Sequence, residues 1–116
     1  MNKEARKILE RHIDQIVDEF TFIRRQKNDV SACPCYSSSS CHPDIPSGEL
    51  NCLFCLCPNY INSGKETGCR INSPKGKWYP NENYANGLVW DCSDCDYPHR
   101  TENVKKELRK LWGIVD

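Results

Sequence analysis

Apolar residues recur at intervals of three and four along the first 28 residues of the chain. They are Ala5, Leu9, Ile13, Ile16, Phe20 and Ile23. This spacing places them on one face of a helix, and no Pro or Gly interrupts the stretch. The pattern predicts an N-terminal amphipathic helix over residues 1–28.

The same spacing returns close to the C-terminus. Val104, Leu108, Leu111 and Trp112 share one face of a predicted helix over residues 101–112. Thr101 is a candidate cap for this helix, and Gly113 is placed to end it. We expect the two helices to pack on each other. The alternative is a homodimer formed through the N-terminal helix.

The stretch between the helices loses this periodicity. It holds all seven prolines and all nine cysteines. Short apolar runs at Trp78-Tyr79 and Leu88–Trp90 predict strands, and four consecutive serines after Tyr36 predict a loop. We therefore predict a small α+β protein. Its helix over 1–28 precedes a cysteine-rich domain over 29–116, which carries the C-terminal helix.

Composition argues against a large apolar core as the source of stability. The apolar fraction is 38%, the mean hydropathy is −0.73, and nine cysteines stand in 116 residues. So many cysteines indicate either a disulfide framework or a metal framework. The sequence has no apolar run typical of a secretory signal or a membrane span, which favours a cytoplasmic protein with reduced thiols. An odd number of cysteines also fits disulfides poorly, so we predict metal binding.

Two Cys-x-x-Cys pairs carry the main metal hypothesis. Cys52 with Cys55 and Cys92 with Cys95 could supply the four thiolates that tetrahedral zinc prefers. This grouping predicts a zinc-ribbon-like core stabilised by the ion. The alternatives are that the pairs serve different ions or are only buried thiols.

A second set of donors surrounds these pairs. It comprises Cys33, Cys35, Cys41, His42, Cys57, Cys69 and His99. These residues exceed what one further ion needs, so we expect two zinc ions in all, with Cys33 as a spare thiol. Cys57, which precedes Pro58, is expected to bind a different ion from its neighbour Cys55. An iron–sulfur cluster is the alternative cofactor, because cysteine-rich sites also suit iron.

The order of these residues resembles the cysteine-rich small domain family. The similar stretches are Cys41-His42, Asn51–Tyr60, Cys69 and Asp91–Arg100, and Cys35 would match an upstream cysteine. Leu56 and Asn59 depart from the family pattern, as does the loop before Cys41, but no sulfur ligand is lost. The resemblance implies a metal-binding, zinc-finger-like domain, found mostly in archaea and anaerobic bacteria. Some similar domains are fused to the threonine-phosphate decarboxylase of cobalamin synthesis, which suggests a cobalamin or anaerobic redox context by analogy.

Charge and motifs narrow the function classes. The chain has 16 basic and 16 acidic residues, so its overall charge favours neither nucleic acid nor an anionic membrane. Lys75, Lys77 and Trp78, with Arg100, form a weak candidate RNA surface, for which a solvated face is the favoured interpretation. No Ser/His/Asp set, carboxylate pair or phosphate loop appears, so we name no catalytic residue.

We therefore expect a metal-binding module with structural zinc that contacts an unknown protein partner. An iron–sulfur redox protein and an RNA-binding zinc-ribbon-like protein are the alternatives. An enzyme would need an open zinc site, for which His42 or His99 with two cysteines is the place to look.

Overall fold

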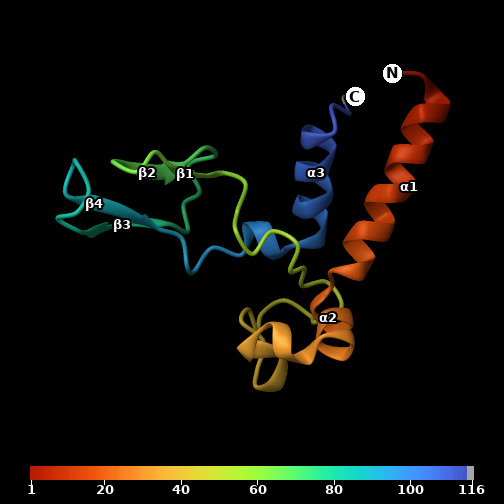
Figure 1. Cartoon of the computed structure of the whole chain (residues 1–116), viewed down its shortest axis with the longest axis horizontal. Coiled ribbons are helices and arrows are strands. Elements are labelled where there is room, and N and C mark those ends of the chain that lie inside the picture. Colours follow the sequence, from red (N-terminus) through yellow and green to blue (C-terminus); the bar gives the residue numbers. More distant parts are fainter. Residues whose placement is uncertain (115–116) are drawn as a thin grey trace. The chain divides into compact units, whose positions relative to one another are not determined.

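The computed structural model describes residues 1–114 and divides the chain into two compact units (Figure 1). The helical unit comprises Met1–Cys55 and the segment from Tyr97 onward, and the hairpin unit comprises Leu56–Asp96. Residues 115 and 116, which end the predicted domain over 29–116, lie outside the described residues. The described part contains three α-helices and two small antiparallel sheets, so the predicted α+β class is confirmed.

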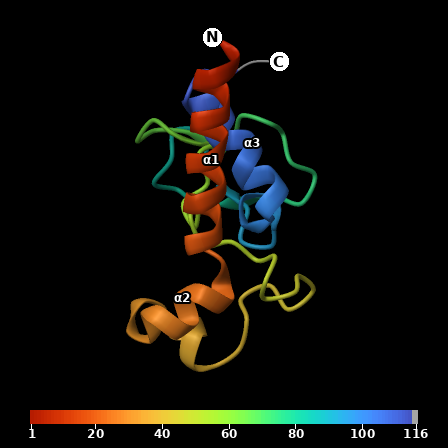
Figure 2. The ribbon, with the colours of Figure 1, turned by 90° about the vertical axis from the view of Figure 1, so that its right-hand side faces the viewer.

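Two helices of the helical unit lie side by side (Figures 1 and 2). They are α1 (Lys3–Glu19) and α3 (Thr101–Leu111). Apolar side chains of the two helices, together with Ile114 just after α3, form a buried cluster of Ile13, Val17, Val104, Leu108 and Ile114. The predicted packing of the N-terminal helix on the C-terminal helix is therefore confirmed.

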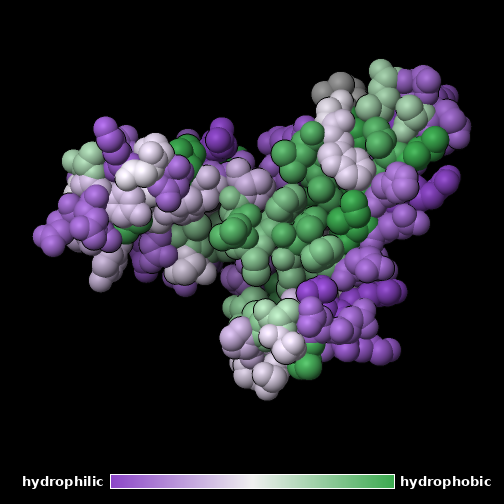
Figure 3. All heavy atoms as spheres, in the orientation of Figure 1, coloured by the Kyte–Doolittle hydropathy of each residue, from purple (hydrophilic) through white to green (hydrophobic). Residues whose placement is uncertain are grey.

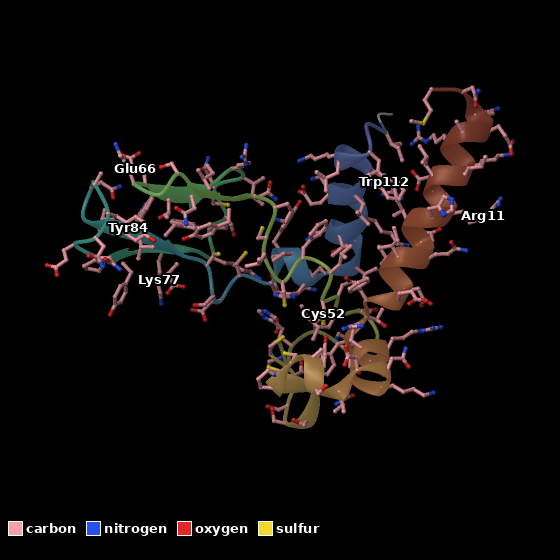
Figure 4. The ribbon with its side chains drawn as sticks, viewed as in Figure 1. Arg11, Cys52, Glu66, Lys77, Tyr84 and Trp112 are labelled. Atoms are coloured by element: carbon pink, nitrogen blue, oxygen red, sulfur yellow. The ribbon has the colours of Figure 1, made fainter. Side chains whose placement is uncertain are left out.

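The rim of this helix pair is polar. Arg109 of α3 binds both carboxylate oxygens of Glu10 on α1, at 2.8 and 2.9 Å. In the face drawn in Figure 3, apolar residues gather between the two helices, and hydrophilic residues cover the outer side of α1. Arg11 projects from that outer side in Figure 4. No helix in the described residues is long and apolar enough to cross a membrane.

The chain forms two helices where the periodicity predicts one over residues 1–28. α1 ends at Glu19, and a short helix, α2 (Phe22–Asn28), follows it. Backbone groups at the break bond to a distant segment: the Phe22 amide donates to the Leu50 carbonyl at 2.7 Å, and the Phe20 carbonyl accepts from the Cys52 amide at 2.8 Å. These bonds join residues about 30 positions apart, so local periodicity cannot reveal them.

The C-terminal helix agrees with the predicted range over 101–112, but its cap differs. Arg100 is the capping residue, and Thr101 is already helical. The Thr101 hydroxyl instead donates a 2.7 Å hydrogen bond to the Glu49 carbonyl, because a long-range acceptor lies within its reach. Gly113 follows the helix at φ +70°, a left-handed conformation that favours glycine, as predicted.

A second apolar cluster surrounds α2. It consists of Phe22, Tyr36, Ile45 and Leu50, all buried. The partly buried side chains of Cys33, Cys35 and Cys52 pack against it. The helical unit therefore has two apolar clusters, and three of its five cysteines border the second one.

The hairpin unit contains two antiparallel β-hairpins. β1 (Tyr60–Asn62) pairs with β2 (Thr67–Cys69), and β3 (Lys77–Pro80) pairs with β4 (Leu88–Asp91). The predicted strands at Trp78-Tyr79 and Leu88–Trp90 are confirmed as parts of β3 and β4. No pattern in the sequence predicted β1 or β2.

Hydrogen bonds join the two hairpins. The Tyr60 hydroxyl donates to the Trp90 carbonyl, and the Trp90 amide donates to the Thr67 hydroxyl, each at 2.7 Å. Within residues 56–96, the only apolar side chain that is buried is that of Cys95. The indole N–H of Trp90 is buried there without a hydrogen-bond partner. An unpaired buried donor is destabilising, and neither of the two buried apolar clusters includes a residue from this unit to offset it.

The cluster between α1 and α3 should dominate the stability of the helical unit. Ile13→Ala removes a fully buried side chain and should lower the free energy of unfolding by about 2–5 kcal/mol. Ile8→Ala makes the same change on the same helix at a side chain that is 44% exposed, and should cost less than about 1 kcal/mol. Denaturant unfolding followed by far-UV circular dichroism measures both. Equal losses in the two variants would contradict this assignment of the core.

Candidate metal centre

The two units divide the nine cysteines into two sets. All nine are free thiols. The helical-unit set comprises Cys33, Cys35, Cys41, Cys52 and Cys55, and the hairpin-unit set comprises Cys57, Cys69, Cys92 and Cys95. The boundary falls at Leu56, between two cysteines that are only two positions apart.

The helical-unit thiols lie close enough to influence one another. Burial raises the pKa of the Cys35 thiol, and charge on Cys33 adds to that rise. Burial raises the pKa of Cys41 to about 11, and negative charge on Cys35, Cys52 and Cys55 contributes to that rise. Figure 4 shows sulfur atoms gathered near the labelled Cys52, beside the loop that follows α2. Five sulfur atoms from three short segments therefore share one region of this unit.

Asn51 fixes the turn that carries Cys52 and Cys55. Its side chain is fully buried; Nδ2 donates to the Val17 carbonyl at 2.8 Å, and Oδ1 accepts from the Leu53 amide at 3.0 Å. The first bond ties the turn to the end of α1, and the second closes the turn itself. The sequence analysis assigned Asn51 no role of its own, although an Asn two residues before a backbone amide is a known turn signal.

Two imidazole rings lie near this turn in the helical unit. The ring centroids of His42 and His99 are 4.5 Å apart, with planes tilted by 39°. His99 is buried, and its Nδ1 lies 3.0 Å from the Asn51 carbonyl oxygen. A histidine whose Nδ1 is held by a backbone carbonyl presents Nε2 as its ligating nitrogen, a common arrangement at metal sites. The structure thus brings together both predicted histidines, in the unit that holds Cys41.

The four cysteines of the hairpin unit stand at the ends of its hairpins. Cys69 is the last residue of β2, and it pairs with Tyr60, the first residue of β1. The Tyr60 amide in turn donates to the carbonyl of Cys57 at 3.1 Å. Cys57 and Cys69 therefore flank the same end of the β1–β2 hairpin.

Cys92 and Cys95 follow β4 in a tight turn. The Cys95 amide donates to the Cys92 carbonyl at 2.9 Å, and the Ser73 hydroxyl lies 3.2 Å from the Cys95 sulfur. Burial raises the pKa of Cys92, and so does charge on Cys57, Cys95 and Cys69. All four sulfur atoms are therefore close enough to interact electrostatically.

Burial and neighbouring thiols both oppose ionisation of the cysteines in each set. Burial, as the largest cause, raises the pKa values of Cys35, Cys52, Cys55 and Cys92, and neighbouring thiols add to the effect. A raised thiol pKa means that the proton stays bound at neutral pH, because several thiolates in one place repel one another. A bound cation reverses this balance, so metal binding to either set would release protons.

The side chains are not arranged around a common point. Across the described residues, no group of three or more His, Cys, Asp or Glu side chains is positioned to hold a metal ion. Metal binding would therefore require the thiols of a set to rotate toward one centre. The donor chemistry itself suits zinc or iron, because thiolates and imidazoles are the ligands these metals take.

The two Cys-x-x-Cys pairs of the main hypothesis belong to different units. Cys52 and Cys55 lie in the helical unit, and Cys92 and Cys95 lie in the hairpin unit. The single site that joins all four stays a prediction. In the helical unit, Cys55 is influenced by charge on Cys33, Cys35 and Cys52, and in the hairpin unit Cys92 is influenced by charge on Cys57, Cys69 and Cys95.

The candidate RNA-binding residues have acidic partners. Lys75 binds the buried carboxylate of Asp96 at 2.7 Å, and Lys77, labelled in Figure 4, lies 3.8 Å from Asp94. Trp78 is 47% exposed and meets Trp90 edge-on at 5.2 Å. In the helical unit, Arg100 lies 3.9 Å from Asp44. Each basic group therefore has a carboxylate beside it, which weakens attraction for phosphate.

No family model, curated protein or solved structure matches this chain. The resemblance to the cysteine-rich small domain family stays a prediction.

Asn51 offers a direct test of how the Cys52 turn is held. Asn51→Ala leaves the Val17 carbonyl and the Leu53 amide without their partner, at a cost of about 1–3 kcal/mol for each buried group. We expect a clear loss of thermal stability. Asn28→Ala, at an exposed position at the end of α2, is the matched control and should change little. A neutral Asn51→Ala variant would show that the turn does not depend on this side chain.

Proposed function

We propose that this is a metal-binding protein with one thiolate site in each unit, and that zinc has a structural role in it. In the hairpin unit, Cys57, Cys69, Cys92 and Cys95 would supply all four ligands of one zinc ion. In the helical unit, the five cysteines, with His42 and His99 beside them, would supply the ligands of a second ion. The protein would act as a binding module, and we assign it no catalytic residue.

The absence of an apolar core in residues 56–96 is the observation that carries this proposal. A segment of about 40 residues seldom folds without a disulfide or a metal. Here the thiols are free, and Cys95 is the only buried apolar side chain. A structural zinc ion contributes apparent binding free energies of about 10–16 kcal/mol, which is enough to stabilise such a unit.

The positions of the four cysteines support a zinc-ribbon-like arrangement. In zinc ribbons, loops at the ends of hairpins provide cysteines to one tetrahedral ion. Cys57 and Cys69 belong to the β1–β2 hairpin, while Cys92 and Cys95 follow the β3–β4 hairpin. The hydrogen bonds that Trp90 forms with Tyr60 and Thr67 join the two hairpins beside these positions.

Metal removal should unfold one unit and spare the other. Strong chelation under reducing conditions should disorder residues 56–96, because they have no apolar core, while α1 and α3 retain their packed cluster. The helical band in far-UV circular dichroism should persist. Tryptophan fluorescence should change sharply in a Trp112→Phe variant, whose remaining Trp78 and Trp90 both lie in the hairpin unit. Unchanged fluorescence in metal-free protein would contradict the proposal.

Paired cysteine variants can decide how the ligands are grouped. If each unit holds its own ion, Cys69→Ser and Cys92→Ser each lose the same ion, and the double variant loses no more than either. Cys52→Ser combined with Cys92→Ser should lose both ions. If Cys52, Cys55, Cys92 and Cys95 share one ion, that second pair would lose only one. Native mass spectrometry of anaerobically purified protein counts the ions and also distinguishes zinc from an iron–sulfur cluster.

A further inference from the structure

The outer side of α1 carries a row of positive charges. Lys3, Lys7 and Arg11 follow one another at intervals of four residues, so they share one face of the helix and lie about 6 Å apart along its axis. We call these three residues the basic stripe. All three are exposed, and Arg11 projects outward from α1 in Figure 4. The basic stripe is therefore accessible to a partner over about 12 Å of helix.

The basic stripe borders a surface groove of about 450 Å³. The groove is lined by Lys3, Arg6, Lys7, Glu10, Arg11 and Asp14. Cations of α3 already bind both of its carboxylates: Arg109 binds Glu10 at 2.8 Å, and Lys105 binds Asp14 at 3.2 Å. By contrast, no carboxylate of the described residues forms an ion pair with the basic stripe. The groove therefore presents an excess of positive charge.

The charges of α1 run against the dipole of the helix. Residues 3–12 hold four basic and two acidic side chains, whereas residues 13–19 hold three acidic side chains and no basic one. The N-terminal end of a helix dipole is positive, so basic residues there and acidic residues at the other end are unfavourable within the chain. This arrangement does not stabilise α1, but it suits a negatively charged partner at the N-terminal half of the helix.

The surroundings of the groove distinguish between kinds of polyanion. Its lining has no aromatic ring, whereas single-stranded nucleic acids bind where their bases can stack on such rings. The apolar side of α1 is buried against α3, so it is not available to enter a lipid surface. Duplex nucleic acid needs neither feature, because Lys and Arg bind its phosphates directly. The major groove of B-DNA also admits an α-helix, whereas that of A-form RNA is too deep and narrow.

We propose that the basic stripe binds the phosphate backbone of duplex DNA without reading its sequence. Each of the three cations neutralises one phosphate, and the release of condensed counterions drives the association. The acidic residues 14, 18 and 19 repel the backbone, so it meets the N-terminal half of α1. A net charge of zero does not prevent this, because at about 0.1 M salt charges more than about 10 Å apart are largely screened. The packing of α1 on α3 needs no ion, so this proposal does not depend on the metal sites.

Fluorescence anisotropy of a short labelled DNA duplex measures the affinity of the full chain. With three phosphate contacts, binding should weaken about 40-fold between about 50 and 200 mM salt, which is a slope of about −2.7 on logarithmic axes. Combining Lys3→Gln, Lys7→Gln and Arg11→Gln should bring this slope close to zero, and Lys7→Gln alone should reduce it by about one. Glutamine is a good helix former and the three positions are exposed, so the variants should stay folded, as far-UV circular dichroism checks.

A matched variant separates the basic stripe from net charge. Lys27→Gln, Lys65→Gln and Lys106→Gln together remove the same three charges at exposed positions outside the groove, and this variant should still bind. Equal losses in the two triple variants would refute the role of the stripe, as would absence of binding by the unaltered protein at about 50 mM salt. Equal or tighter binding to single-stranded DNA, duplex RNA or phosphatidylserine vesicles would refute duplex DNA as the partner.

Discussion

The fully buried amide of Asn51 is the contact on which the helical unit depends. Its side chain bonds to the end of α1 and to the turn that carries Cys52, and its backbone amide donates to the His99 carbonyl at 2.7 Å. One residue therefore joins three segments that are far apart in the sequence. The segment around Asn51 also causes the break between α1 and α2. Leu50 and Cys52 take the backbone hydrogen bonds that a continuous helix would have formed within itself.

The two units rely on different physical forces. The helical unit buries two apolar clusters, whereas the hairpin unit is joined by hydrogen bonds around a largely polar interior. The polar residues buried there include Asn59, Thr67 and Asp96. Such an interior leaves the free energy of folding close to zero unless another stabilising contribution is added. If the proposed zinc site is present, it stabilises the unit that needs it most.

Sequence patterns predicted the elements that local periodicity specifies. The helical faces of α1 and α3 and the apolar runs of β3 and β4 were visible, because neighbouring residues alone define them. The break at Thr21 was not, since long-range bonds to Leu50 and Cys52 create it. β1 and β2 also escaped notice because they are only three residues long and include Asn62 and Gly68, which strands disfavour. Spacing grouped the two Cys-x-x-Cys pairs as one predicted set, and it carried no sign of the unit boundary at Leu56.

On the proposed function, the two units would acquire metal in different ways. In the helical unit, apolar packing and the hydrogen bonds of Asn51 order the backbone of the Cys52 turn, and these contacts need no ion. When the backbone that carries a ligand is already ordered, binding costs only the entropy of its side chain. In the hairpin unit, the binding free energy of the ion must offset the conformational entropy lost when about 40 residues become ordered. On the proposed function, the two sites would thus differ in affinity, and the helical unit would be the first to fill.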